Sequence, residues 1–457
     1  MNAEIFREYD IRGHAEKDLD NDTVDMIAKA FASMVIEKGG RVVCLGRDNR
    51  ESSERISSVF SKGLTDSGLK VFDVGVVPIP ALYYSVIAFG AHGGAMVTGS
   101  HLAKEFNGFK LSAEKTAGTM FGEQIRDLRE RAEKEEFLSL KGKGVVEKKN
   151  VLNSFVGSIA QRAQLDRPLN VAIDCGNGTA SLVAERILRA LGCKVSALYC
   201  TLDSSYPNHH PDPVKPENLV ALIEKVKKEK CDFGVAFDGD SDRLGVVDEK
   251  GNILWGDVLL SLFAQDVIEK HPKAKVVFEV KCSKMVEDVV KRAGGIPILW
   301  KTGHSLIKKK MREEGALLAG EMSGHIFFAD SYFGFDDALF AAARLCEIVS
   351  KRGPLSKMAG DLPKYYATPE LRVECEEKEK WLVVEKAKKY FLGKYEINTI
   401  DGVRVKFKDG WALVRASNTS PVLVLRMEST TKEGLERIKK AMKGAMKVFA
   451  PNLKLGF

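Results

Sequence analysis

Three acidic residues with a spacing of two form a candidate metal site. Asp238, Asp240 and Asp242 directly follow an apolar run that predicts a buried strand. Carboxylates crowded in this way repel one another unless a hard cation neutralises them, and carboxylate oxygens are donors that Mg²⁺ prefers. An Asp-rich turn without a metal is the plainer alternative. An EF-hand is disfavoured, because its sixth position is Arg243 where the calcium loop needs glycine.

A second candidate is a hydroxyl in a glycine-flanked turn. Ser100 lies in Thr98-Gly-Ser-His101, at the end of another apolar run, and can serve as a nucleophile or a phosphate carrier. His101 and Lys110 would supply positive charge or proton transfer beside it. Taken alone, a Ser-His pair of this kind is more often an ordinary turn.

Two polar loops later in the chain have the composition of ligand-binding loops. The first carries Glu321, Ser323 and His325, whose donors and acceptors suit a hydroxyl-rich ligand such as a sugar. The second, 415–420, places a guanidinium, hydroxyls and an amide in a row after a predicted strand, as in a phosphate cradle. Structural turns are the alternative for both loops.

Three of these four loops end equivalent stretches of a pattern that occurs three times. Residues 41–48, 169–178 and 274–283 are strand-like runs, each followed by a helical pattern, a glycine and a second strand. A third apolar run then leads into the serine loop, the aspartate loop or the loop 320–325. This order predicts parallel strand pairs, and ligands bind at the carboxyl ends of such strands. We therefore expect three strand ends to converge on one cleft.

The last part of the chain follows a different pattern. Residues 370–457 combine helical stretches at 377–391 and 431–448 with strands at 403–407 and 411–415. This predicts a smaller α+β domain. The expected fold class is α/β, with three related α/β units of mixed, largely parallel sheets and a C-terminal α+β domain around a central cleft.

Composition argues against several other classes of protein. The 457 residues carry a net charge of +7, and the basic runs 225–230 and 308–310 fit solvated helix faces, not a nucleic-acid partner. The arginines of 47–50 are interpreted as surface ion pairs. Eight cysteines without a CxxC favour buried reduced thiols. The first ten residues have no apolar h-region, and the charge-free stretch 74–103 is broken by prolines and glycines, so we expect a cytoplasmic protein without a signal peptide or a membrane span.

Together, the motifs resemble those of the α-D-phosphohexomutases, most closely the bacterial phosphomannomutase/phosphoglucomutase branch. The resemblance spans essentially the whole chain and implies four domains, here at 1–146, 147–252, 253–365 and 366–457. It rests, in the family's order, on Tyr9-Asp-Ile-Arg12-Gly, the serine loop, Asp238-Gly-Asp-Ser-Asp-Arg243, Lys301-Thr-Gly-His304-Ser, Gly320-Glu-Met-Ser-Gly-His325 and Arg415-Ala-Ser-Asn-Thr419.

What the resemblance implies is an intramolecular phosphotransferase that interconverts the 1-phosphate and 6-phosphate of mannose, glucose or both. Phosphorylated Ser100 would donate its phosphoryl group to the hexose phosphate. The resulting hexose 1,6-bisphosphate, which is both intermediate and activator, would turn over in the cleft and return its other phosphoryl group to Ser100. One Mg²⁺ per chain would be held by Asp238, Asp240, Asp242 and an oxygen of phosphorylated Ser100. Mn²⁺ or Zn²⁺ could substitute for it.

The family's other roles carry over by position in the same way. The implied catalytic residues are Ser100, His101, Lys110, Arg243, His325 and Arg12, with Lys110, His325 and Arg12 as candidates for moving the hydroxyl proton of the substrate. Substrate binding falls to Tyr9, Lys281 and His304, to Glu321 and Ser323 for the sugar hydroxyls, and to Arg415, Ser417, Asn418 and Thr419 for the non-reacting phosphate.

The sequence departs from the family in the serine loop, where Leu102-Ala103 replaces the usual Asn-Pro and alters the rigidity of the loop. Ser420 stands where many relatives carry Glu or Thr. Phosphoglucosamine mutase is an alternative, although its loop commonly has Gln in place of Met322. A metal-dependent phosphatase is disfavoured by Asp242, where such enzymes need Thr or Val, and a non-catalytic sugar-phosphate binder is the third alternative. The expected partners are small hexose phosphates, with the chain a monomer or small homo-oligomer.

Overall fold

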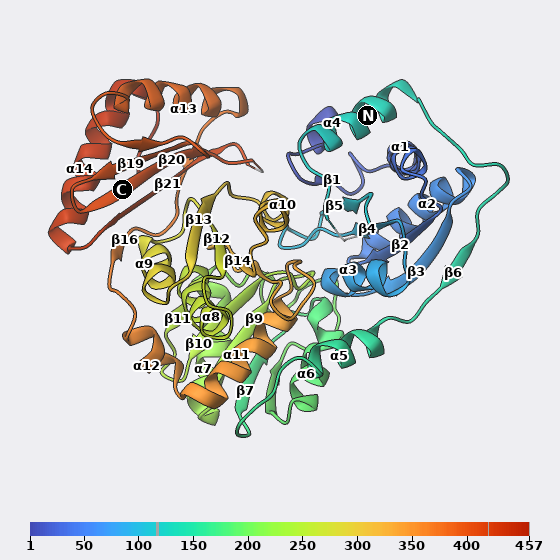
Figure 1. The fold of residues 1–457 in the computed structure, drawn as a ribbon. Coiled ribbons are helices and arrows are strands. Elements are labelled where there is room, and N and C mark those ends of the chain that lie inside the picture. The colour runs from blue at the N-terminus through green and yellow to red at the C-terminus, as the bar shows by residue number, and fades with distance from the viewer. Residues whose placement is uncertain (116–117, 419, 457) are drawn as a thin grey trace.

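The computed structural model describes residues 1–115, 118–418 and 420–456, which form three related α/β units and a C-terminal unit (Figure 1). In each of the first three, the first strand pairs in parallel with the second and the third, and a fourth returns antiparallel beside the third. The expected threefold pattern and mixed, largely parallel sheets are confirmed. The strands are β2 (Val42–Arg47), β3 (Lys70–Val76), β4 (Gly93–Val97) and β5 (Phe106–Ser112); β7 (Asn170–Asp174), β8 (Lys194–Leu198), β9 (Phe233–Phe237) and β10 (Leu244–Asp248); β12 (Lys275–Glu279), β13 (Ile296–Trp300), β14 (Leu318–Gly320) and β15 (Ile326–Phe328).

Edge strands extend two of these sheets. β1 (Ile11–His14) runs antiparallel to β5, and β6 (Val146–Lys148) runs parallel to β3. β11 (Ile253–Leu254) runs antiparallel to β10. β6 and β11 lie where the sequence places the first two unit boundaries.

Helices connect the strands, and some of them begin at a side chain that caps the first turn. Asp20 accepts a 2.8 Å hydrogen bond from the Thr23 N–H at the start of α1, and Asp337 accepts hydrogen bonds from two N–H groups at the start of α11. The helices of the three units are η1 (Ala3–Ile5), α1 (Asn21–Glu37), α2 (Glu51–Asp66), α3 (Ile79–Ala88), α4 (Glu123–Lys134), α5 (Leu152–Ala160), η2 (Thr179–Leu182), α6 (Ala184–Ala190), η3 (Pro216–Leu219), α7 (Val220–Glu229), α8 (Gly256–Lys270), α9 (Lys284–Arg292), α10 (His304–Glu314), α11 (Ala338–Arg352) and α12 (Leu355–Gly360).

The C-terminal unit is an antiparallel sheet covered by two helices, as the sequence predicts. α13 (Glu377–Phe391) and α14 (Lys432–Phe449) pack against each other and against the central strands. The strands are β16 (Tyr366–Ala367), β17 (Leu371–Glu374), β18 (Ile397–Asn398), β19 (Val403–Phe407), β20 (Gly410–Ala416) and β21 (Val422–Ser429), with β21 pairing β16, β17 and β20.

The hydrophobic cores divide the molecule into a central body and two flanking parts. One continuous core runs through the second and third units and includes α3 of the first. The first unit has a further core of its own between its sheet and α1, α2 and α4, and the C-terminal unit has another. Figure 1 shows the first and last units on either side of the second and third. The first unit therefore joins the central body through α3, and a small apolar cluster of Val280, Trp411 and Leu413 joins the C-terminal unit to the third.

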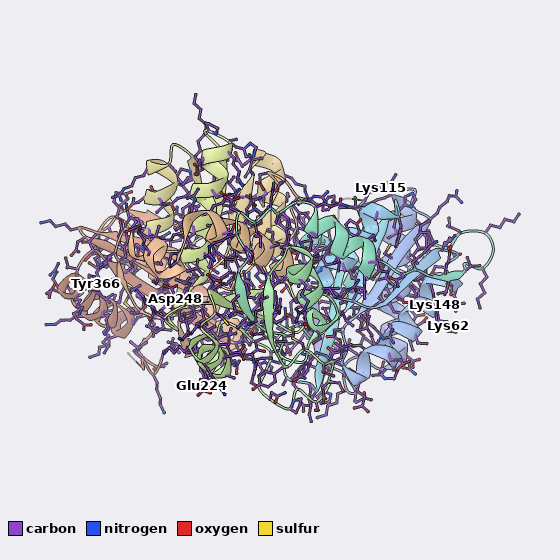
Figure 2. All side chains as sticks on the ribbon, turned by 90° about the horizontal axis from the view of Figure 1, so that it is seen from below. Lys62, Lys115, Lys148, Glu224, Asp248 and Tyr366 are labelled. Carbon is purple, nitrogen blue, oxygen red and sulfur yellow. The ribbon has the colours of Figure 1, made fainter. Side chains whose placement is uncertain are left out.

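The charge-free stretch forms α3 and the fully buried β4, which confirms the expectation of buried structure there. Among the described residues, no helix is long and apolar enough to cross a membrane. All eight cysteines are free thiols, and all but Cys200 are buried. Exposed charged side chains such as Lys62 on α2 and Glu224 on α7 point outward (Figure 2).

Candidate active site

Loops from all four units meet in one cleft with a volume of about 1260 Å³. Ser100 and the three aspartates lie just beneath its wall and are almost completely buried. Thr419 lies outside the described residues. The structure thus brings together every described residue that the sequence assigns to the site; those on the cleft wall are Tyr9, Arg12, His101, Lys110, Arg243, Lys281, His304, Glu321, Ser323, His325, Arg415, Ser417 and Asn418.

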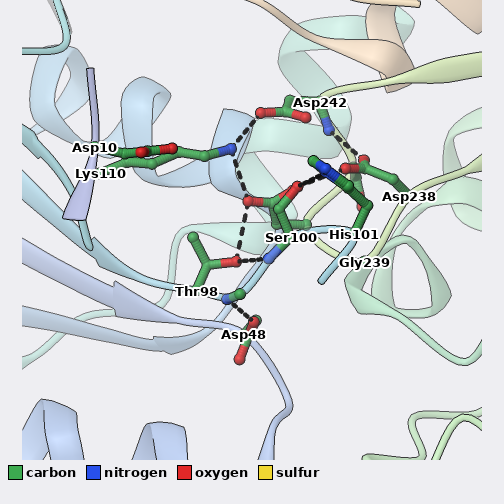
Figure 3. Close-up of polar contacts among 12 residues, drawn as sticks. Asp10, Asp48, Thr98, Ser100, His101, Lys110, Asp238, Gly239 and Asp242 are labelled. Atoms are coloured by element: carbon green, nitrogen blue, oxygen red, sulfur yellow. Dashed lines mark hydrogen bonds and ion pairs between the residues drawn. The ribbon is translucent and has the colours of Figure 1, made fainter. Parts of the chain in front are cut away.

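Ser100 points from the loop after β4 toward the loop after β9 (Figure 3). Its Oγ donates a 2.9 Å hydrogen bond to Asp238 Oδ2, and His101 Nδ1 lies 3.2 Å away. The Thr98 hydroxyl donates to Asp240 Oδ2 at 3.0 Å and accepts from the Ser100 N–H at 2.9 Å. Ser100 has a φ of 46°, a left-handed conformation that is unfavourable for a residue with a side chain. Contacts around the loop must therefore hold it in place.

Arg50 supplies most of these contacts. Its side chain is buried, so the sequence-based interpretation of this residue as a surface ion pair is wrong. Its Nε pairs with Asp48 Oδ2 at 3.2 Å, and the same oxygen accepts the Gly99 N–H at 2.9 Å. A Cβ at Gly99 would lie 2.4 Å from the guanidinium, so the loop needs glycine there. The guanidinium also donates to four loop carbonyls, those of Ser100 (2.8 Å), Leu102 (2.6 Å), Ala103 (2.6 Å) and Phe106 (3.1 Å).

The aspartate loop has the donors of a divalent-cation site. Asp238, Asp240 and Asp242 are fully buried, and one oxygen from each lies within 4.8 Å of the others. Asp240 Oδ1 is buried and accepts no hydrogen bond from any described residue. Gly239 lets this loop approach the serine loop, because a Cβ there would lie 2.5 Å from the Ser100 carbonyl oxygen.

The electrostatics of this loop also fit a bound cation. Burial and the charges of Asp242 and Asp240 raise the pKa of Asp238 well above its usual value. Lys110 Nζ lies 2.9 Å from Asp240 Oδ2 and 2.5 Å from Asp242 Oδ2. Burial lowers the pKa of Lys110, but these carboxylates outweigh burial and raise it. One ammonium among three carboxylates leaves negative charge that a hard cation would balance.

The sugar-recognition candidates form a charged pair beside the aspartates. His325 Nδ1 lies 2.9 Å from Glu321 Oε2, and its Nε2 lies 3.3 Å from Asp242 Oδ1. Burial lowers the pKa of His325, but the carboxylates outweigh it and raise the pKa to about 9. His325 is therefore an imidazolium at neutral pH, and Glu321 is ionised, with its pKa lowered to about 2 by His325 against the effect of burial. Ser323 Oγ lies 2.9 Å from His325 Nδ1.

The N-terminal segment closes over this loop. The ring of Tyr9 meets the edge of His304 at 5.2 Å between centroids, and His304 stacks on His325 at 5.6 Å. Arg12 forms a 2.5 Å ion pair with Asp10. The first and third units thus hold each other at the cleft.

Lys308 lies behind His304 and is not part of a solvated basic face. Its Nζ lies 2.8 Å from Asp336 Oδ1, and both side chains are at most 2% exposed. Asp336 Oδ2 lies 3.3 Å from His304 Nδ1. The sequence-based interpretation of 308–310 is therefore wrong at Lys308.

We expect Asp336→Asn to lower the free energy of unfolding by about 3–5 kcal/mol, because it leaves the Lys308 ammonium buried without a counter-charge. Urea unfolding at pH 7 measures this. Glu287→Gln, which removes an exposed i,i+4 ion pair with Lys291, is the matched control and should change stability by less than about 1 kcal/mol. A similar loss in both variants would contradict the prediction.

The described phosphate-binding candidates lie at the end of β20, which holds Arg415, and in the loop that follows it, which holds Ser417 and Asn418. Arg415 Nε pairs with Asp401 Oδ2 at 3.1 Å, while its Nη2 is buried and bonds to no described residue. Lys380, buried on α13, donates to the carbonyl oxygens of Ser417 at 2.6 Å and Ser420 at 3.1 Å. The loop backbone is thus fixed from behind, with a guanidinium on the cleft wall.

Two ion pairs join this unit to the third. Lys281 Nζ lies 3.0 Å from Glu370 Oε2, and Arg426 Nη2 lies 3.1 Å from Asp257 Oδ2. Lys281 lowers the pKa of Glu370 to about 2. Lys281 therefore reaches the cleft with a carboxylate partner in place.

Sequence reasoning missed several residues that shape the site. Thr98 stands two residues before Ser100, and its hydroxyl could have indicated a role. Arg50 lies in the short loop between β2 and α2, at the carboxyl end of a parallel strand, which is where ligand-binding groups gather. Lys380 lies in a helix rich in Glu and Lys, where no local signal distinguishes it from solvent-exposed lysines.

Comparison with known proteins identifies the class that this fold and site define. Models of the phosphoglucomutase/phosphomannomutase family match all four units: α/β/α domain I at residues 3–139, domain II at 152–251, domain III at 255–366 and the C-terminal domain at 370–445. The chain therefore belongs to the phosphoglucomutase/phosphomannomutase family and is an enzyme.

Individual relatives match over nearly full length. The chain is 46% identical to the phosphomannomutase/phosphoglucomutase of Pseudomonas aeruginosa, covering 100% of this chain and 98% of that one. It is 44% identical to a phosphoglucomutase of Neisseria gonorrhoeae, covering 98% and 97%. A crystal structure of a phosphoglucomutase/phosphomannomutase family protein from Burkholderia thailandensis superposes with a TM-score of 0.93 at 41% identity, covering 100% of both chains.

Proposed function

We propose that this enzyme interconverts the 1-phosphate and 6-phosphate of mannose and glucose through a phosphoserine at Ser100. The observation that carries the proposal is the position of the Ser100 hydroxyl, whose Oγ lies 2.9 Å from Asp238 Oδ2. The hydroxyl lies beneath the cleft, and Arg415 and Ser417, the phosphate-binding candidates, line another part of the cleft wall. The relatives in Pseudomonas and Neisseria bear the names of these two activities.

The aspartate loop is proposed to hold one Mg²⁺ per chain, with Asp238, Asp240, Asp242 and an oxygen of phosphorylated Ser100 as ligands. The buried Asp240 oxygen without a hydrogen bond and the all-oxygen donor set support this assignment. When bound, the cation supplies positive charge that offsets the charge moving during phosphoryl transfer. Arg243, part-buried beside Asp242, adds positive charge at the same position.

In the first half of the proposed cycle, the P–O bond at Ser100 breaks and a P–O bond to a sugar hydroxyl forms. In the second half, a P–O bond to the sugar breaks and the P–O bond at Ser100 forms again. Glu321 and Ser323 are placed to accept and donate hydrogen bonds to sugar hydroxyls, with His325 fixing the carboxylate. Arg415, Ser417, Asn418 and Thr419 are proposed to hold the phosphate that does not react. Lys281, His304 and Tyr9 complete the wall. The cleft volume of about 1260 Å³ is large enough for a hexose 1,6-bisphosphate, the proposed activator, to turn over inside it.

The hydroxyl proton must leave as the new P–O bond forms. His325, Lys110 and Arg12 are the candidates, and each must lose its own proton before it can accept that of the hydroxyl. His325 is the one with a pKa, about 9, closest to neutrality, so it loses and regains a proton most readily. His101, whose pKa burial and Arg243 hold well below its usual value, remains neutral beside Ser100.

A coupled assay tests the proposal with the 1-phosphates of mannose, glucose and glucosamine, Mg²⁺ and a trace of glucose 1,6-bisphosphate. Isomerisation of mannose and glucose phosphates faster than of glucosamine phosphate is the expected result. Fastest turnover of glucosamine phosphate would indicate a phosphoglucosamine mutase. Release of inorganic phosphate without isomerised sugar would indicate a phosphatase, and binding without either product would indicate a sugar-phosphate binder.

Removing divalent cations is expected to lower kcat by about 10³-fold, because the charge neutralisation attributed to the cation is worth several kcal/mol. The assay is run on enzyme dialysed against a chelator and then supplied with Mg²⁺, Mn²⁺ or Zn²⁺. Full activity after chelation, with no metal found by elemental analysis, would contradict the metal assignment.

A further inference from the structure

Two cysteines in the second unit lie close enough to react with each other. Cys175 follows β7 and Cys200 lies two residues after β8, which are parallel neighbours. Their Sγ atoms are 2.9 Å apart, less than 1 Å more than the disulfide bond length of about 2.05 Å. Neither residue belongs to the proposed catalytic machinery.

The backbone is shaped to bring this pair together. Tyr199, just before Cys200, has a φ of 52°, a left-handed conformation that turns the chain after β8 back toward Cys175. The Cys175 N–H bonds to the Leu198 carbonyl at 3.1 Å, and the Asn177 N–H bonds to the Tyr199 carbonyl at 2.9 Å. The two strand ends are thus held in register, and a cross-link requires little chain movement.

The pair is accessible from one side. Cys175 is completely buried, whereas Cys200 is partly exposed. Burial and the neighbouring Cys200 raise the pKa of Cys175 well above its usual value, so Cys200 is the thiol that meets an oxidant first. Cys175 is then the resolving thiol at contact distance.

The loop that begins at Cys175 holds the aspartate loop from behind. The Thr179 N–H donates to the Gly239 carbonyl at 3.0 Å, and the Thr179 hydroxyl lies 3.0 Å from Ser241 Oγ. A Cβ at Gly178 would lie 2.9 Å from the Gly239 carbonyl oxygen, which shows how tightly the two loops pack. A displacement at Cys175 of a few tenths of an ångström is therefore transmitted to Asp238 and Asp240.

We propose that Cys175 and Cys200 form a reversible disulfide and that its formation lowers the activity of the enzyme. The oxidant is a peroxide. The Cys200 thiolate attacks a peroxide oxygen, so that an S–O bond forms, the O–O bond breaks and the released oxygen leaves as water. Cys175 sulfur then attacks Cys200 sulfur, which forms the S–S bond and breaks the S–O bond, and the second oxygen leaves as water with the Cys175 proton. Two thiols lose two electrons, and a dithiol reductant restores them by exchange.

The test treats the purified full-length enzyme with hydrogen peroxide and follows both cross-linking and activity. Peptide mass spectrometry should find Cys175 joined to Cys200 with the loss of two hydrogen atoms, and mutase activity should fall at least tenfold and return with dithiothreitol. Cys200→Ser should keep its initial activity and lose the response. Cys193 and Cys346, with Sγ atoms 4.0 Å apart in the same central core, provide the matched control, so Cys193→Ser/Cys346→Ser should respond like the wild type.

Three outcomes would overturn the proposal: no Cys175–Cys200 cross-link, a cross-link with activity unchanged, or loss of activity that persists in Cys200→Ser. The activity readout rests on the proposed mutase function, whereas the cross-link does not. Absence of mutase activity before oxidation would therefore count against the proposed function, and the mass measurement would still decide the disulfide.

Discussion

Replacing Ser100 by alanine is expected to lower kcat for hexose phosphate isomerisation by at least about 10⁴-fold, because alanine has no oxygen to carry the phosphoryl group. The fold should persist, since the loop backbone is held by Arg50 through carbonyl groups that the substitution leaves in place. Binding of the sugar phosphate should change little, because the cleft wall comes from other loops. The coupled assay measures kcat, and titration calorimetry measures binding.

A matched control separates chemistry from packing. Ser85 is a fully buried serine in α3 whose hydroxyl donates to the Leu82 carbonyl at 2.7 Å, away from the cleft. Ser85→Ala should retain most of the activity. Intact-protein mass spectrometry after incubation with glucose 1,6-bisphosphate should detect a phosphoryl adduct on the wild type and Ser85→Ala only. Activity of Ser100→Ala above about 1% of wild type would place the nucleophile on another residue.

Replacing Arg50 by alanine is expected to lower kcat by about 10²-fold with KM for the sugar phosphate changed much less. Four carbonyl hydrogen bonds and the pairing with Asp48 fix the loop that carries Ser100 in a left-handed conformation. Displacing a nucleophile by about 1 Å lowers the rate by about 10²-fold. This sequence has Leu102-Ala103 in the loop, without a proline to stiffen it, so the guanidinium carries more of the ordering. Arg50→Lys replaces the planar guanidinium by a single ammonium, so its kcat should lie between those of the wild type and Arg50→Ala.

Chemical rescue distinguishes positioning from a general loss of structure. Added guanidinium at millimolar concentration should restore part of the kcat of Arg50→Ala. Arg55 is the matched control, because it lies on α2 and donates to the carbonyls of Leu19 at 3.0 Å and Ala15 at 2.8 Å in the same unit, away from the serine loop. Arg55→Ala should retain kcat. Equal losses in both variants, without rescue, would mean that Arg50 serves only stability.

The sequence predicts the threefold strand-helix-strand order well because the signal is local and repeated. Each β-branched run of about five residues, such as 42–47, precedes an amphipathic helix and a glycine, so periodicity and turn chemistry point to the same structure. The aspartate loop is also a local signal, because its alternating carboxylates directly follow a run that predicts a buried strand, and that strand is present. Those parts depend on residues close together in the chain.

Other parts depend on contacts that no local pattern contains. Arg50 and Lys308 look like ordinary surface charges in sequence, and both are buried by partners far along the chain, around residue 100 for the first and Asp336 for the second. Lys380 supports the loop of the phosphate-binding candidates from a helix that starts forty residues before Ser417. Burial of a charge is set by tertiary packing, and a single sequence does not indicate which lysine will meet a carbonyl or a carboxylate.

The same loop position, after the third strand, carries the proposed nucleophile in the first unit, the metal-binding candidates in the second and the proposed sugar-binding residues in the third. Copies of one architecture have thus taken separate tasks, and no copy retains the residues of another. A fragment of one or two units would contain only part of the cleft. Because the three loops meet at one cleft, a change in one loop alters the selection on the other two. Substitutions in the three loops are therefore expected to be correlated among relatives.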